Sequence, residues 1–148
     1  QTKHTGEITD QVEAWVQIVE QRSHFEVLEL HWICTGKDVE QAFQRAKSKI
    51  ETFKVQASGT ELIAVQNLES AVMESYETLR LDQHRRNYRK QIFTGEELRD
   101  AALVLEKRGQ KAVSKMDKPR ALLAYSKAIE LMPENVEFRR ALVALARM

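Results

Sequence analysis

The chain contains 148 residues, of which 43% are hydrophobic and 30% are charged, and its formal net charge is +1. A chain of this length can bury one ordinary hydrophobic core or two small cores. The balanced charge excludes a strong overall attraction to nucleic acid or to anionic lipid. No uninterrupted hydrophobic run approaches the length of about 20 residues that a membrane-spanning helix requires.

Glycine and proline are rare, with five and two copies, and alternating patterns typical of strands are hard to find. The sequence therefore predicts an all-α fold. The single cysteine, Cys34, cannot form an internal disulfide, which favours a reducing compartment. Because the chain begins with Gln1 and shows no signal-peptide pattern, we expect a piece of a larger cytoplasmic protein.

Residues 1–23 are predicted to form a leading amphipathic helix that runs from about Glu7 to Arg22. Trp15 lies on its apolar face and is expected to be a packing anchor. Ser23 or His24 then opens a short helix that extends to Leu30. The apolar residues of the leading helix share one face: Ile8, Val12, Trp15, Val16 and Val19.

Two longer helices follow, one from Thr35 to about Phe53 and one from Thr60 to Leu79. Ser58 precedes Glu61 by three residues, which is capping-box spacing, and Thr60 is a second candidate cap. We expect the two helices to pair in an antiparallel hairpin. The apolar stripe of the second one consists of Leu62, Val65, Leu68, Val72, Tyr76 and Leu79.

The stretch from residue 80 to residue 90 is the most basic part of the chain. It is the one cluster that could bind a phosphate-bearing partner, so a module for nucleic acid or anionic lipid is the alternative function. We expect Tyr88 to face the core. The cations of this predicted basic patch are Arg80, Arg85, Arg86, Arg89 and Lys90.

Thr94-Gly95 is the predicted internal boundary, since Gly can end a helix and Thr can cap the next one. Residues 96–148 are predicted to contain three more helices, over 96–115, 119–131 and 135–148. Pro119 suits the first turn of its helix, where no backbone N–H is needed, and Pro133 stops that helix.

Residues 24–93 resemble a J-domain, the helical module of DnaJ-like co-chaperones. The resemblance rests on His24–Leu30 for the opening helix, residues 35–45 for the second helix and Ser75–Leu79 for the end of the third. Arg85 and Tyr88 are similar to the family's conserved tail. The resemblance implies an antiparallel helical hairpin.

One part of the J-domain pattern is missing. Members that stimulate the large heat-shock ATPase carry a His-Pro-Asp tripeptide after the second helix, which would fall here at Glu51, Thr52 and Phe53. We therefore expect a J-like fold without activation of a chaperone ATPase, and a residual co-chaperone is the alternative. Without that stop, the second helix is free to continue past Phe53.

Residues 102–135 resemble a single tetratricopeptide repeat, whose period is about 34 residues. Small side chains at Gly109 and Ala128 would let two helices approach closely, with Tyr125 filling the space beside them. One repeat cannot cover its own apolar face, so we expect it to pack against the J-like part or against something outside this chain, and the N-terminal helix around Trp15 is a second candidate support. The positions that carry the resemblance are Gly109, Ala112, Ala121, Tyr125, Ala128 and Pro133.

The two resemblances together imply a non-enzymatic scaffold that binds a helix or peptide of a partner protein, as in the C-terminal parts of bacterial multidomain signalling or motility proteins. The predicted partner-binding residues are Arg108, Lys111, Lys115, Arg139 and Arg140.

Catalytic and metal-binding patterns are weak. Among the four histidines and the one cysteine, only His31 and Cys34 are spaced three residues apart, so that they could share a helix face. Two ligands do not make a metal site. Cys34 with His31 is the only local pair of nucleophile and base, and no glycine-rich oxyanion or phosphate loop lies nearby, so we expect a packed, inert cysteine. We therefore expect no enzyme, no cofactor and no metal.

Overall fold

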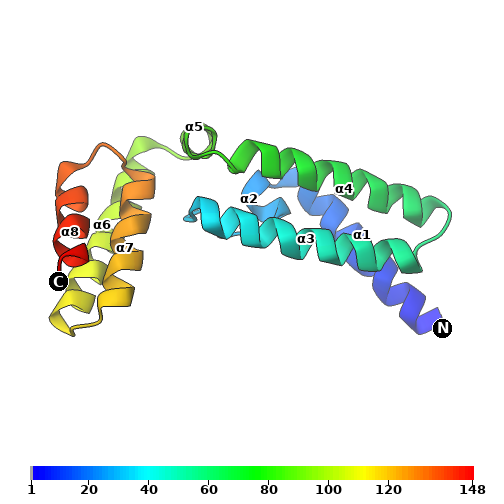
Figure 1. Cartoon of the computed structure of the whole chain (residues 1–148). Coiled ribbons are helices and arrows are strands. Elements are labelled where there is room, and N and C mark those ends of the chain that lie inside the picture. Colours follow the sequence, from blue (N-terminus) through cyan, green and yellow to red (C-terminus); the bar gives the residue numbers. More distant parts are fainter. Residues whose placement is uncertain (1) are drawn as a thin grey trace. The chain divides into compact units, whose positions relative to one another are not determined.

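A computed structural model describes residues 2–148, with side chains from Ile8 onward. The described residues form eight α-helices and no strand, which confirms the all-α prediction (Figure 1). Contacts divide the chain into two units, residues 1–32 with 36–85 and residues 33–35 with 86–148. The division falls between Arg85 and Arg86, whereas the sequence places the boundary at Thr94-Gly95. Among the described residues, no helix is both long and apolar enough to cross a membrane.

The first unit contains four complete helices: α1 (Thr2–Gln21), α2 (His24–Val27), α3 (Gly36–Gln56) and α4 (Thr60–Leu79). Helix α1 begins five residues earlier than expected. Ser23 caps α2 through its side chain, but the helix ends at Val27 rather than at Leu30. Glu29 follows in a left-handed conformation, with φ of 55°, and this turn stops the helix.

Helices α3 and α4 form the expected antiparallel hairpin (Figure 1). The Tyr76 hydroxyl donates a hydrogen bond of 2.5 Å to Glu40, and the Phe43 and Tyr76 rings stack with centroids 3.8 Å apart. Three turns further along α3, Lys54 Nζ lies 2.7 Å from Glu69 Oε2. Contacts that advance along α3 thus move backward along α4, as an antiparallel pair requires.

The predicted cap of α4 is wrong. Gly59 occupies the N-cap position with φ of 60°, and no side chain caps the helix. Neither Ser58 nor Thr60 takes this role, because the chain reverses from α3 through a left-handed residue that only Gly adopts without strain.

Trp15 is a packing residue, as expected. Its side chain is 4% exposed, and its indole N–H donates a hydrogen bond of 2.9 Å to the Val27 carbonyl. The Phe53 ring meets it edge to face, with centroids 6.2 Å apart. The contact joins α1 to the end of α3, and the hydrogen bond also satisfies the polar end of the indole.

The second unit contains most of α5 (Asp82–Ile92) together with α6 (Gly95–Ser114), α7 (Lys118–Leu131) and α8 (Val136–Ala146). Each of its last three helices starts at a side-chain cap. Thr94 forms a complete capping box with Glu97, while Asp117 and Asn135 cap α7 and α8. Pro119 lies in the first turn of α7, as predicted.

Helices α6 and α7 approach closely in an antiparallel pair because Gly109 has no side chain (Figure 1). A Cβ atom at Gly109 would lie 2.6 Å from the nearest carbon of the Tyr125 ring. Tyr125 is 6% exposed, and its burial, followed by the negative charge of Glu106, raises the pKa of the phenol. The predicted role of Gly109 and Tyr125 in helix packing is therefore correct.

The Gly109→Ala variant is expected to be destabilised. Overpacking against Tyr125 costs about 1–3 kcal/mol, against a gain of up to about 1 kcal/mol in helix propensity. Gly95→Ala is the control, because open space surrounds that position and the substitution should be neutral or stabilising. Urea unfolding followed by circular dichroism measures both. A Gly109→Ala midpoint equal to or above that of Gly95→Ala would refute the close-packing account.

Candidate functional site

A groove of about 420 Å³ runs between α6 and α7 of the second unit. The residues of α6 and its C-terminus that line the groove are three or four positions apart, namely Arg108, Lys111, Ala112 and Lys115. The lining residues of α7 have the same spacing. Residues three and four apart share a helix face, so each helix turns one continuous wall toward the groove. The α7 wall consists of Arg120, Leu123, Ala124 and Lys127.

The groove combines positive walls with a partly apolar floor. Five cations line it, and the one carboxylate among its lining residues is Asp117. Asp117 is already engaged, since it caps α7 and lies 3.4 Å from Arg120 Nε. Leu123 is 54% exposed, whereas Leu105 beside it is buried. Such a surface can accept carboxylates and one or two apolar side chains.

Four of the groove cations lack a carboxylate partner. Within the described part of the chain, no Asp or Glu lies within 4 Å of the charged nitrogens of these side chains, which are Arg108, Lys111, Lys115 and Lys127. The second unit as a whole carries 14 Lys and Arg against 8 Asp and Glu, a net charge of +6. The first unit carries 9 against 14, a net charge of −5. The nearly neutral total thus conceals two units of opposite sign.

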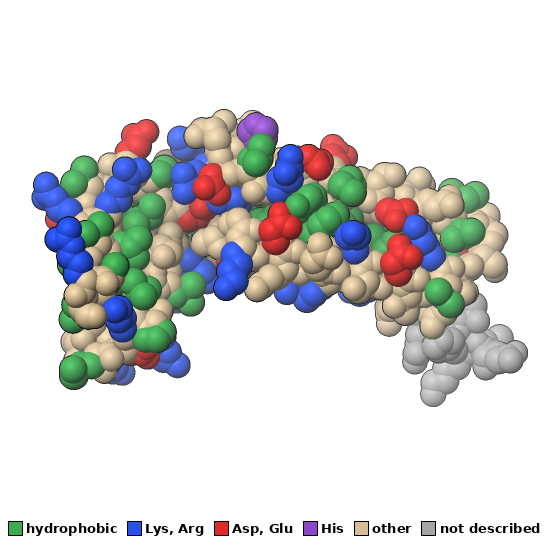
Figure 2. All heavy atoms as spheres, in the orientation of Figure 1, with side chains coloured by type: hydrophobic (Ala, Val, Ile, Leu, Met, Phe, Trp, Pro, Cys, Tyr) green, Lys and Arg blue, Asp and Glu red, His purple; other side chains and the backbone are tan. Residues whose placement is uncertain are grey.

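The space-filling view shows the same mixture. Figure 2 shows Lys and Arg side chains in blue among exposed hydrophobic side chains in green over the second unit.

The other two predicted partner-binding residues, Arg139 and Arg140, lie on α8. Both are exposed and line a shallow hollow of about 370 Å³ on the outer face of this helix. The five predicted residues therefore belong to two separate surfaces of the second unit. Sequence reasoning missed Arg120 and Lys127, although their positions three and four residues from Leu123 and Ala124 mark the same face.

The predicted basic patch is not a continuous surface, which corrects the sequence analysis. Arg85 and Arg89 are each 1% exposed, and Tyr88, expected in the core, is only half-buried. Arg85 donates to the Leu79 carbonyl at 3.1 Å and pairs with Asp82 at 2.7 Å. These partners hold the guanidinium inside the first unit, so it is not available to an external phosphate.

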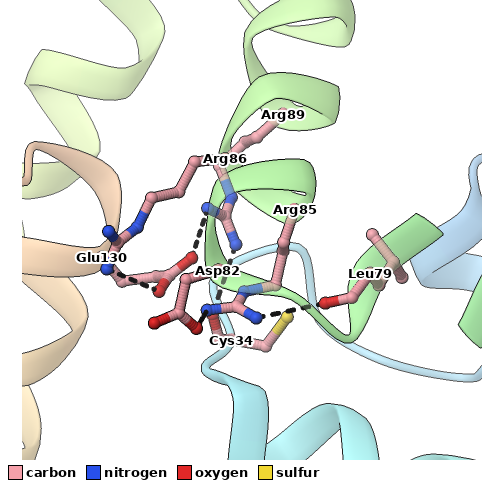
Figure 3. A network of polar contacts seen from close by, with 7 residues as sticks. All are labelled: Cys34, Leu79, Asp82, Arg85, Arg86, Arg89 and Glu130. Atoms are coloured by element: carbon pink, nitrogen blue, oxygen red, sulfur yellow. Dashed lines mark hydrogen bonds and ion pairs between the residues drawn. The ribbon is translucent and has the colours of Figure 1, made fainter. Parts of the chain in front are cut away.

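Arg89 forms a buried ion pair in the second unit. Its Nη1 lies 2.7 Å from Glu130 Oε2, and its Nη2 donates to the Cys34 carbonyl at 3.2 Å (Figure 3). Arg86 approaches the other Glu130 oxygen at 3.4 Å. The Glu130 side chain is 4% exposed, so one buried carboxylate of α7 pairs with two guanidinium groups of α5. Arg80 also has a carboxylate neighbour, Glu77 at 3.2 Å.

The positions of the missing tripeptide lie within the last turns of α3. Glu51 and Thr52 are exposed, and Phe53 is buried against Trp15. The helix continues to Gln56, as expected for a sequence without the proline stop. No loop is formed at the position where J-domains present the tripeptide.

Cys34 is buried. In the part of the chain that the structure describes, no three His, Cys, Asp or Glu side chains converge as metal ligands would.

Comparison with protein-family models, curated proteins and solved structures finds no match to the chain. The J-domain and tetratricopeptide resemblances therefore stay predictions.

Proposed function

We propose that the chain is a non-enzymatic protein-interaction module whose second unit binds an acidic segment of a partner protein in the groove between α6 and α7. The observation that carries the proposal is the set of four cations without carboxylate partners around exposed Leu123. The cations can pair with carboxylates, and the exposed leucine can contact an apolar side chain. We therefore expect a segment in which Asp or Glu residues flank an apolar residue.

The first unit has a different role in this proposal. With Glu51, Thr52 and Phe53 in a continuous helix, the hairpin of α3 and α4 has no tripeptide loop with which to stimulate a chaperone ATPase. We infer that it is a J-like scaffold. Unchanged ATP turnover by a heat-shock ATPase upon addition of the chain is the expected result, and stimulation would overturn this inference.

A nucleic-acid or lipid module built on the run from Arg80 to Lys90 has less support. Arg85 and Arg89 of this run are buried and cannot contact an external phosphate. Arg80 and Arg86 each lie within 4 Å of a carboxylate of the chain. Sequence-independent binding to phosphates needs several accessible cations, because affinity grows with the number of phosphates neutralised.

Fluorescence anisotropy with a labelled peptide of glutamates interrupted by leucine tests the groove. Lys111→Glu should weaken binding roughly three- to tenfold, because it replaces an attraction in the groove with a repulsion. Lys107→Glu is the matched control, since Lys107 is an exposed residue of α6 outside the groove. Wild-type binding should also weaken as salt is raised.

Two outcomes would contradict the proposal. Equal affinities for the Lys111→Glu and Lys107→Glu variants would show that the groove does not hold the peptide. Tighter binding of mixed-sequence duplex DNA, lost in Lys111→Glu, would replace the protein segment with a nucleic acid as the occupant.

A further inference from the structure

A second surface lies on α8, away from its contact with α7. Six side chains occupy positions i, i+3, i+4, i+7, i+8 and i+11 and therefore form one stripe along the helix. All six are exposed, and a hollow of about 370 Å³ follows the stripe. They are Val136, Arg139, Arg140, Val143, Ala144 and Arg147.

The orientation of α8 is set by its opposite face. Phe138 and Leu145 are buried, and Leu145 belongs to a cluster with Ala112 and Tyr125 of the α6–α7 pair. Because these contacts fix the rotation of α8, Val136 and Val143 must point outward, where they are 54% and 50% exposed. Together with Ala144 they form a line of three apolar side chains on the exposed face of the helix.

The charge of the stripe is positive. Arg140 lies 3.5 Å from Glu137, but both side chains are more than 70% exposed, and such a pair contributes little. Arg139 and Arg147 have no carboxylate within 4 Å in the described part of the chain. The stripe therefore attracts a negatively charged partner and repels a second copy of itself, since a two-fold contact would place arginine against arginine.

We propose that this face of α8 binds an amphipathic α-helix of a partner protein, with apolar residues at i, i+3, i+4 and i+7 flanked by Asp and Glu. Helix α8 has 11 residues and is about 16 Å long, which suits three turns of a partner helix. Apolar ridges of the partner would pack between Val136 and Val143, and its carboxylates would pair with the arginines. A nucleic-acid backbone offers no apolar group for the valines.

An added strand is disfavoured as the occupant. Strand addition requires unpaired backbone N–H and C=O groups, whereas those of α8 are used within the helix. The surface is also independent of the α6–α7 groove, because the two sets of lining residues have no member in common.

Isothermal titration with a synthetic amphipathic helix, carrying leucine on one face and glutamate beside it, tests the proposal. Wild-type protein should bind this peptide and should not bind its lysine counterpart. Val143→Glu should weaken binding at least tenfold by placing a carboxylate among the partner's leucines and glutamates. The control Val104→Glu, on α6, should leave binding unchanged because Val104 is also 50% exposed and lies outside both surfaces.

The outcomes separate this surface from the groove. We expect Lys111→Glu to leave the affinity for the helical peptide unchanged, and Val143→Glu to leave that for the glutamate-leucine peptide unchanged. The proposal would be overturned if Val143→Glu and Val104→Glu lost equal affinity for the helical peptide, or if neither lost any. It would also be overturned if the wild-type protein did not bind the peptide. A loss confined to Lys111→Glu would place the helix in the groove and likewise overturn it.

Discussion

Replacing Glu130 with Ala is expected to lower the free energy of unfolding of the second unit by about 3–5 kcal/mol. The loss arises because the Arg89 side chain, which is 1% exposed, loses the buried carboxylate that lies 2.7 Å from its Nη1, and a buried charge that loses its ion-pair partner is costly. Arg86, which is 25% exposed, can turn toward water and adds little to the loss.

The measurement separates the two units. Trp15 and Trp32 both belong to the first unit, so tryptophan fluorescence follows that unit while far-ultraviolet circular dichroism follows both. In urea, Glu130→Ala should shift the transition seen by circular dichroism. Glu134→Ala is the control, because Glu134 is an exposed carboxylate just beyond α7 and its removal should cost less than about 0.5 kcal/mol.

A double variant distinguishes two causes of destabilisation, the loss of the ion-pair partner and the loss of buried side-chain volume. Arg89→Met with Glu130→Leu removes both charges and keeps apolar bulk, so it should be more stable than Glu130→Ala alone. Equal unfolding midpoints for Glu130→Ala and Glu134→Ala would show that the pair is not buried in solution.

Phe43→Asp is expected to unfold the first unit, at a cost of several kcal/mol, because it places a carboxylate where the ring is 6% exposed and stacked on Tyr76. Phe43→Leu is the matched control. It keeps an apolar side chain and loses chiefly the ring contact, worth about 0.5–1.5 kcal/mol.

Tryptophan fluorescence during urea unfolding reports this loss directly, since both tryptophans lie in the affected unit. The expected order of midpoints is wild type, then Phe43→Leu, then Phe43→Asp. A Phe43→Asp midpoint at or above that of Phe43→Leu would contradict the placement of Phe43 in the core of the hairpin.

The two proposed surfaces give the second unit a common chemical preference. Both the groove and the outer face of α8 combine cations without carboxylate partners with exposed apolar side chains. The proposed occupants differ, since we propose an acidic segment for the groove and an amphipathic helix for α8. The net charge of +6 on this unit should increase the rate at which acidic partners associate with both surfaces.

Helix positions were largely predictable from the sequence. The predicted range from Thr60 to Leu79 matches α4 at both ends, and Thr94 and Pro119 mark the starts of α6 and α7. The error at Gly59 has a local cause: a serine and a threonine near the start suggested caps, but the chain enters α4 through a left-handed turn.

Burial of charge was not predictable. Arg89 and Glu130 lie 41 residues apart, and no local pattern indicates that α7 brings a carboxylate to α5. A run of arginines and lysines is usually solvated, so the sequence predicted a basic surface where the structure has ion pairs.

The amino-acid sequence by itself determined the all-α class, most helix boundaries and the close approach at Gly109, because periodicity, caps and small side chains act over a few residues. Only the tertiary structure decided which cations are accessible, that Arg120 and Lys127 join Arg108 and Lys111 around one groove, and that α8 exposes a stripe of valine and arginine. The reason is that accessibility depends on which helix faces meet, and these contacts join residues far apart in the chain.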